Sequence, residues 1–239
     1  MRRQNYTEKE IRAKVEKFLT EDNIATLYQQ EFVGYTGNAS DGEKDHKRPY
    51  SEIIAEILLK DIEAGNNVLN KISEVIRKKS YKIPSHQGNC PGAKKTSRVE
   101  EWIAKDMFNQ TYATIGKVFD YQVPLKGKQS DKNVGKIDLV SETKDTVYLL
   151  ELKREDNTES ILRCVLEIYT YFKQLQHRQF LDDFKLSEKN KIVPAILVFK
   201  NGKQHCQFMS ESKNVNKLMK KLGIKMFTIK STYDVTEED

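Results

Sequence analysis

The sequence predicts a mixed α/β fold, in which helices flank a mixed sheet and a helical extension precedes it. Three observations support this class. Apolar residues recur at helical spacing through the first 80 residues, the segments 115–124, 134–141 and 146–153 resemble strands, and a long helical segment leads to an apolar strand at 192–200. Helices and strands in this order form a sheet with helices packed against it.

Residues 1–80 are predicted to form a helical N-terminal region. Ile11, Val15 and Phe18 lie at helical spacing behind a Thr and an early Glu, which is typical of a capped helix start. Residues 33–49 are rich in Gly, Asn, Ser and Asp and are expected to form a loop. Helix is expected to resume after Pro49 and to continue to about residue 79. We expect this region to select a substrate or a partner.

Residues 81–96 are predicted to be a linker loop, because the stretch 82–95 contains two prolines and two glycines. It separates the N-terminal region from a second unit at 97–239. That unit should begin with a helix from Ser97 and the three strands. Further elements are then expected in the order helix 159–180, strand 192–200, helix 211–222 and strand 224–229.

The charge balance suits a polyanionic partner such as nucleic acid. Lys and Arg number 41 against 35 acidic residues, which gives a net charge of +6. Basic residues cluster at 77–79, 94–95, 126–128 and 220–221. The alternative interpretation of each cluster is a solvated face.

The sequence lacks an apolar stretch of signal-peptide length near Met1 and any run approaching the roughly 20 apolar residues that span a bilayer. We therefore expect a cytoplasmic protein with no membrane partner. Cys90, Cys164 and Cys206 are far apart and fit neither a disulfide framework nor a zinc site.

Charged residues interrupt a predicted hairpin within residues 135–155. Asp138 lies in its first strand, and Glu151 and Lys153 lie at the end of its second. If the turn is centred on Thr143 and Lys144, Asp138 lies opposite Leu149 and Lys136 lies opposite Glu151. Asp138 and Glu151 then share one face as a diagonal pair, with Cα atoms roughly 7–8 Å apart.

Two carboxylates at this separation repel each other unless a positive charge lies between them. Oxygen ligands of this kind favour Mg²⁺ or Mn²⁺ over zinc. Lys153 lies on the same face, where an ammonium group can stabilise negative charge that develops on a phosphate. The alternative is an exposed ion pair between Glu151 and Lys153, which contributes about 0–1 kcal/mol.

The segments GKID and LLELK resemble the PD-(D/E)xK nuclease superfamily, whose signature here is Asp138, Glu151 and Lys153. Ile137 stands where the family pattern has proline. The resemblance covers roughly residues 97–200 and implies a restriction-endonuclease-like α-β-β-β-α-β core. It also implies metal binding by Asp138 and Glu151, assisted by the carbonyl of Leu152.

The resemblance further implies a third carboxylate on the helix before the hairpin. Glu100 projects near the middle of the apolar face of that helix, where it would complete the metal site. Glu101 projects to the side and is the alternative candidate. A second alternative is that Glu100 lies at the rim and points outward.

The helix after the hairpin carries Glu167 and Tyr171, which are similar to the (Q/E)-hydrophobic-x-x-Tyr element of one branch of these nucleases. Residues four apart share a helix face, so Arg163 lies on the same side as Glu167. We expect Arg163, Glu167 and Tyr171 to be accessory residues that contact nucleic acid.

The expected function is that of a Mg²⁺-dependent phosphodiesterase, an endonuclease or exonuclease, with DNA as the expected substrate. A homodimer is compatible with this function. The alternative is a catalytically inactive nucleic-acid-binding or assembly module on the same fold, and a third hypothesis is a structural protein whose charges face solvent.

Overall fold

A mixed sheet forms the centre of the computed structural model, which describes residues 5–20, 23–41, 47–86, 99–129, 131, 134–188, 191–210, 213–231 and 234–238. The described strands follow one another across the sheet in chain order. They are β1 (Thr111–Tyr112), β2 (Gly116–Pro124), β3 (Lys136–Glu142), β4 (Thr146–Leu152), β5 (Lys191–Phe199), β6 (Lys225–Ser231) and β7 (Asp234–Glu238). β4, β5 and β6 run parallel, and the other neighbours are antiparallel. The predicted mixed α/β class is confirmed.

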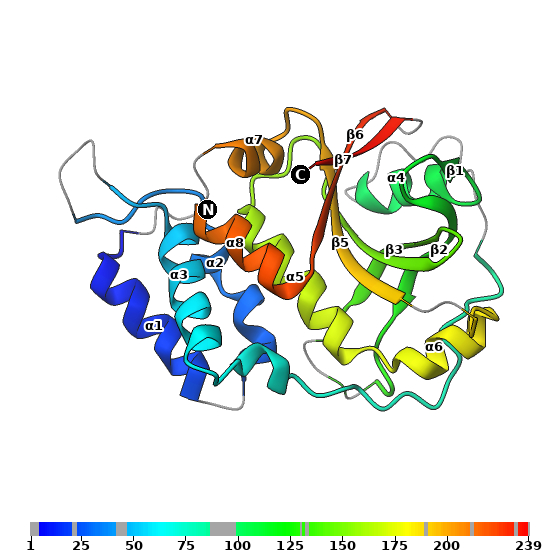
Figure 1. Ribbon diagram of the computed structural model, residues 1–239, viewed down its shortest axis with the longest axis horizontal. Helices are drawn as coiled ribbons and strands as arrows, with labels where there is room; N and C mark the ends of the chain where they lie inside the picture. The colour runs from blue at the N-terminus through cyan, green and yellow to red at the C-terminus, as the bar shows by residue number, and fades with distance from the viewer. Residues whose placement is uncertain are drawn as a thin grey trace.

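The helices lie at one end of the molecule and around the sheet (Figure 1). Those of the described residues are α1 (Glu8–Thr20), α2 (Glu31–Gly34), α3 (Tyr50–Glu63), α4 (Val99–Met107), α5 (Ile161–Gln174), α6 (His177–Phe184), α7 (Lys203–Met209) and α8 (Lys213–Leu222). Two 3₁₀ turns, η1 (Ile24–Gln29) and η2 (Val68–Lys71), connect the N-terminal helices. α5 lies between these helices and the sheet (Figure 1).

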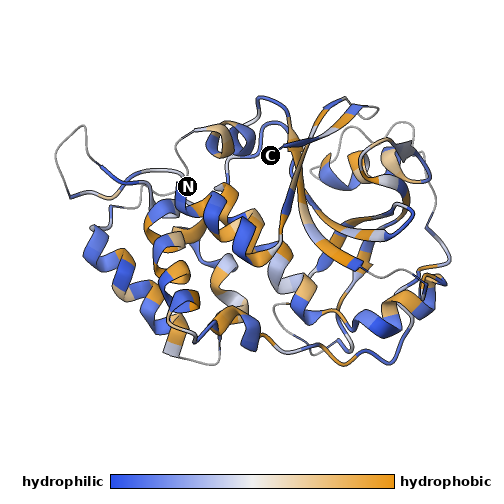
Figure 2. Ribbon diagram, in the orientation of Figure 1, coloured by the Kyte–Doolittle hydropathy of each residue, from blue (hydrophilic) through white to orange (hydrophobic). Residues whose placement is uncertain are grey.

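Alternation along the strands separates two hydrophobic clusters, one on each face of the sheet. Leu139 and Leu150 belong to the cluster that contains Ala104 and Met107 of α4. Val140 and Leu149 belong to the cluster that contains α5. Figure 2 shows the hydrophobic residues concentrated on the strands and on the inner sides of the helices.

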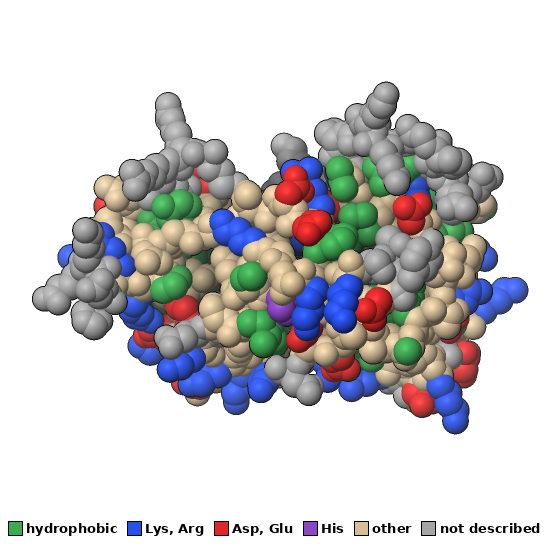
Figure 3. Space-filling view, turned by 90° about the horizontal axis from the view of Figure 1, so that it is seen from above, with side chains coloured by type: hydrophobic (Ala, Val, Ile, Leu, Met, Phe, Trp, Pro, Cys, Tyr) green, Lys and Arg blue, Asp and Glu red, His purple; other side chains and the backbone are tan. Residues whose placement is uncertain are grey.

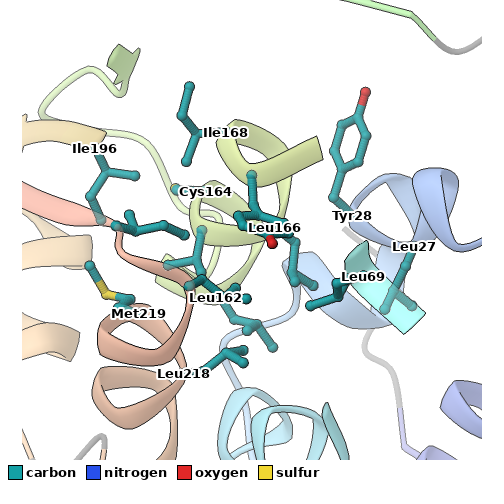
Figure 4. Packing of buried hydrophobic residues seen from close by; sticks show 14 of the residues in the cluster. Leu27, Tyr28, Leu69, Leu162, Cys164, Leu166, Ile168, Ile196, Leu218 and Met219 are labelled. Carbon is teal, nitrogen blue, oxygen red and sulfur yellow. The ribbon is translucent and has the colours of Figure 1, made fainter. Parts of the chain in front are cut away.

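α5 is buried around most of its circumference, as expected of a helix in the centre of a core. Figure 4 shows Leu162 and Leu166 of α5 among residues from η1, η2 and α8, represented by Leu27, Leu69 and Leu218. One hydrophobic cluster therefore joins the N-terminal helices, α5 and one face of the sheet. Residues 87–96 of the expected linker, and Ser97, lie outside the described residues.

The hairpin has a different register from the predicted one. Val140 lies opposite Leu149, and Leu139 lies opposite Leu150, a shift of two residues. The cause is the turn, in which the Thr143 N–H donates to the Thr146 carbonyl, so that the turn is centred one residue later. A shift of two residues keeps every side chain on its predicted face. Continuing the ladder by one step places Asp138 directly opposite Glu151.

The prediction of helix from residue 66 to 79 is wrong. Gly65 and Asn67 have φ angles of 81° and 40°, in the left-handed region that ends helices. Only the short turn η2 follows, and residues 72–80 then pass from the end of α5 to α6, where the Val75 N–H donates to the Gln174 carbonyl and the Lys79 carbonyl accepts from Gln179.

The helix predicted at 159–180 is two helices, because Leu175 leaves helical geometry with ψ of 131°. Helix α7 and the edge strand β7 were not predicted from the sequence. β7 carries a run of acidic residues, which is unusual in a strand. Lys200 and Lys225 pair with Glu238 and Glu237 of that strand, at 2.7 and 2.6 Å.

Candidate active site

The hairpin carboxylates and Lys153 meet on the face of the sheet covered by α5. The backbone N–H of Leu152 donates to Oδ2 of Asp138 at 3.0 Å, which ties the start of β3 to the end of β4. Glu151 and Lys153 are only 3 % and 6 % exposed, and their side chains lie 2.7 Å apart. The structure therefore brings Asp138, Glu151 and Lys153 together, and the exposed ion pair of the alternative interpretation is excluded.

Lys153 is surrounded by carboxylates. Its Nζ lies 2.7 Å from Glu151, 3.2 Å from Glu167 and 3.5 Å from Glu159. Burial alone would lower the pKa of Lys153, but Glu151 and Glu167 outweigh burial and raise the pKa well above its usual value. Lys153 is therefore a fixed positive charge.

The site contains more acid than base. Arg163 pairs with Glu159 at 3.0 Å, which leaves Lys153 to balance Asp138, Glu151 and Glu167. Burial, reinforced by Glu167 and Glu100, raises the pKa of Asp138 to about 7, although Lys153 and the Leu152 N–H act against it. Burial and the charges of Asp138 and Glu167 likewise raise the pKa of Glu151. Without a bound cation, this site retains protons that ordinary carboxyl groups release.

α5 presents Glu167 and Tyr171 to this cluster. Ser160 caps the helix by accepting from the Arg163 N–H at 3.2 Å, and its own hydroxyl donates to the Val33 carbonyl at 2.5 Å. The Tyr171 hydroxyl donates to Glu167 at 2.9 Å. Burial acts to raise the pKa of Glu167, but Lys153 and hydrogen bonds from neighbouring side chains outweigh it and lower the pKa.

Gly135 has a steric role in the segment GKID. A Cβ atom at this position would lie 2.1 Å from the Tyr171 hydroxyl oxygen. A side chain at residue 135 would therefore displace Tyr171 and the hydrogen bond that orients Glu167.

Glu100 of α4 reaches the end of β4. Its Oε1 accepts from the Arg154 N–H at 3.3 Å and from the Asn157 amide at 3.4 Å. Its charge also contributes to the raised pKa of Asp138. Glu101 instead pairs with Lys105 on its own helix at 2.8 Å. Of the two candidates, Glu100 is the one directed toward the site.

Arg163 lies at the edge of the cluster rather than in its centre. Besides its ion pair with Glu159, its guanidinium group packs against α2, where a Cβ on Gly34 would lie 3.2 Å from it. These contacts give Arg163 a structural role in joining α2 to α5.

Two further residues of the site were missed by the sequence analysis. Gln122 has φ of 48°, which is strained for a non-glycine residue in a strand, and its amide donates to Asp138 at 2.7 Å. The Tyr28 hydroxyl approaches that of Tyr171 at 3.4 Å, and Gln29 donates to Tyr28 at 2.9 Å. Figure 4 shows the Tyr28 hydroxyl directed away from the apolar cluster. Neither position carries a sequence signal, since each depends on the tertiary fold.

The donor set fits a hard divalent cation in its chemistry. Asp138 and Glu151 supply carboxylate oxygens, and Glu100 lies nearby. The N–H and C=O of a strand residue point to the same side, so the Leu152 carbonyl faces the strand that carries Asp138. Within the described ranges, no three His, Cys, Asp or Glu side chains are already grouped around one metal position. Binding would therefore require the Glu151 side chain to turn from Lys153.

Comparisons with protein-family models, curated proteins and solved structures find no match to this chain. Among the described helices, none is long and apolar enough to cross a membrane. Because no relative suggests a role, the geometry and charge of the site are the observations that bear on function.

Proposed function

We propose that this chain is a metal-dependent nuclease of the restriction-endonuclease-like fold, which hydrolyses phosphodiester bonds of nucleic acid, with DNA as the expected substrate. The acidic excess around Lys153 carries the proposal, because buried carboxylates that repel one another are a site for a cation. The order α4, β2, β3, β4, α5, β5 supports it, since the PD-(D/E)xK resemblance implies the same order.

In this proposal Asp138, Glu151, the Leu152 carbonyl and Glu100 would hold Mg²⁺ or Mn²⁺. The bound ion would supply Lewis acidity, lowering the pKa of water and offsetting charge on the scissile phosphate. Asp138 is already oriented for this role by its hydrogen bonds to Leu152 and Gln122.

Lys153 would stabilise the transition state by its positive charge. Its Nζ also lies 3.2 Å from Glu167, so Lys153 would retain this partner if the Glu151 carboxylate turned away. Tyr171 holds Glu167 in the orientation needed for this contact. The ammonium group then stabilises the negative charge that develops on the phosphate during displacement.

Cleavage assays with single-stranded DNA, duplex DNA and RNA, in Mg²⁺, Mn²⁺ or chelator, test the proposal. We expect metal-dependent cleavage that Asp138→Asn reduces by at least about 100-fold. Glu101→Gln is the matched control, because it removes a carboxylate one residue from Glu100 and should leave the rate within about twofold. Equal cleavage by wild type and Asp138→Asn, in protein free of contaminating nuclease, would contradict the mechanism.

A second candidate is a nucleic-acid-binding or assembly module without catalysis. The enclosure of Lys153 by three carboxylates favours it, because the cluster is partly neutralised without a metal. This candidate predicts nucleic-acid binding together with an unfolding temperature that Mg²⁺ does not change. The nuclease hypothesis instead predicts that Mg²⁺ raises the unfolding temperature.

A further inference from the structure

Two basic segments that are distant in the sequence lie together along the lower edge of the molecule (Figure 1). Arg77 and Lys126 are 49 residues apart, and the Arg77 guanidinium donates to the Lys126 carbonyl. A Cβ on Gly127 would lie 2.0 Å from the Ile76 carbonyl, so the two backbones are in direct contact. The tertiary fold therefore merges the clusters at 77–79 and 126–128.

These segments form a groove of about 920 Å³. Lys78 and Lys128 line it, are exposed and have no acidic partner in the part of the chain that the structure describes. Asp131 is the acidic residue of the described lining, and its Oδ2 accepts from the N–H groups of Gly127 and Lys128, at 2.9 Å each, so two lysines face one carboxylate. The groove therefore presents positive charge to a ligand.

The groove lies close to the candidate active site along the chain. Val134 lines it, and the next residue, Gly135, lies under the Tyr171 hydroxyl. Asp138 follows four residues after Val134, a distance of at most about 13 Å along an extended chain. A strand bound in the groove would therefore lie near Asp138.

The surface on the other side of the molecule has a different character. Figure 3 looks onto the upper face, where Lys and Arg lie beside Asp and Glu near the middle. In this described middle part of the upper face, the acidic groups interrupt the positive charge.

We infer that this groove binds one strand of the phosphate backbone of the substrate, an inference that rests on the proposed nuclease function. Its volume is that of a ligand pocket and is too small for a whole duplex. Lysine ammonium groups contact phosphate as point charges. Ile76, which is 70 % exposed, offers an apolar contact to sugar or base. The groove should be indifferent to sequence, because contacts to phosphate carry no sequence information.

Fluorescence anisotropy with a labelled single-stranded DNA oligonucleotide and its duplex, in chelator over a range of salt, tests the inference. Lys78→Ala combined with Lys128→Ala should weaken binding of the single strand about tenfold or more. It should also reduce the slope of log affinity against log salt by about 1.4, because each phosphate contact to a single strand contributes about 0.7. Lys220→Ala with Lys221→Ala, an exposed basic pair on α8, is the matched control and should change affinity less than about twofold.

An unchanged salt slope in the groove variant, or an equal loss in the control, would overturn the inference. So would a loss confined to the duplex, since the groove is inferred to hold one strand. Binding in chelator does not depend on cleavage. If the wild type binds through the groove but does not cleave, only the proposed nuclease function is overturned. If the groove variant cleaves with unchanged KM, only the inferred role of the groove is overturned.

Discussion

Two charge clusters in this protein differ in their effect on carboxylates: one lowers the pKa of Glu56, and the other raises the pKa values of Asp138 and Glu151. The first joins α1 to α3, where Arg48 contacts Glu8 at 2.8 Å and Glu56 at 2.5 Å, and Lys60 contacts Glu56 at 2.6 Å. Arg12 adds a third base to these two acids. A hydrogen bond from Lys60, with Arg48 and Arg12, lowers the pKa of Glu56 to about 2. This cluster stabilises charged carboxylates.

The second cluster, around Lys153, has one base among three carboxylates and is more deeply buried. Burial there raises the pKa of Asp138 and Glu151. The fold thus holds these carboxylates in an environment that disfavours their charge. The difference supports the proposal that the second cluster binds a cation, whereas the first cluster stabilises the fold.

The largest effect is expected from removing the base of the second cluster. Lys153→Met keeps the length of the side chain but leaves the buried Glu151 and the half-buried Asp138 and Glu167 without a cation, which should cost about 3–5 kcal/mol in the free energy of unfolding. Lys60→Met, the matched change in the first cluster, should cost less than about 1 kcal/mol. Urea denaturation measures both, and equal losses would remove the distinction between the clusters.

A smaller effect is expected from replacing Asp138, and this substitution should increase the stability of the metal-free protein. Its pKa is about 7 in the folded protein and 3.8 ordinarily, so between these values the unfolded chain has released a proton that the folded chain keeps. The stability of the metal-free protein should therefore fall as pH rises from about 4 to 7. Relative to wild type, Asp138→Asn should gain up to about 4 kcal/mol of stability between pH 4 and pH 8. Denaturation of both proteins in chelator checks this, and parallel pH profiles would refute it.

The smallest effect is expected from replacing Glu56, and this substitution should decrease the stability of the protein. Its pKa is lowered from 4.5 to about 2, so its contribution is present above pH 4.5 and disappears as pH falls toward 2. Glu56→Gln should cost about 1 kcal/mol at pH 7, since the group is partly exposed, and nothing at pH 2. Thermal unfolding across this range is the measurement. A loss that persists at pH 2 would show that Glu56 acts through packing and not through charge.

The sequence predicted the central strands, the core helix and the side chains of the second cluster because these depend on local alternation and spacing. Asp138, Glu151 and Lys153 lie on the predicted face of the sheet, although the observed hairpin register differs from the predicted one by two residues. The register depended on hydrogen bonding within the turn, which composition does not specify.

The remaining features depend on long-range contacts that periodicity cannot reveal. Tyr28 reaches Tyr171 across 143 residues, and Arg77 reaches Lys126 across 49. Gln122 contacts Asp138 through a strained backbone that no residue preference indicates. Local pattern therefore identified the charged centre of the site, and tertiary structure supplied the residues that orient it.

Calorimetric titration of Mg²⁺ into the metal-free protein at pH 7, in two buffers of different ionisation enthalpy, tests the proposed cation site directly. We expect saturable binding at one site with release of protons, because the cation would displace those held by Asp138 and Glu151. Asp138→Asn should abolish this binding. Absence of binding by the wild type, or equal binding by the variant, would contradict the central claim that these carboxylates form a cation site.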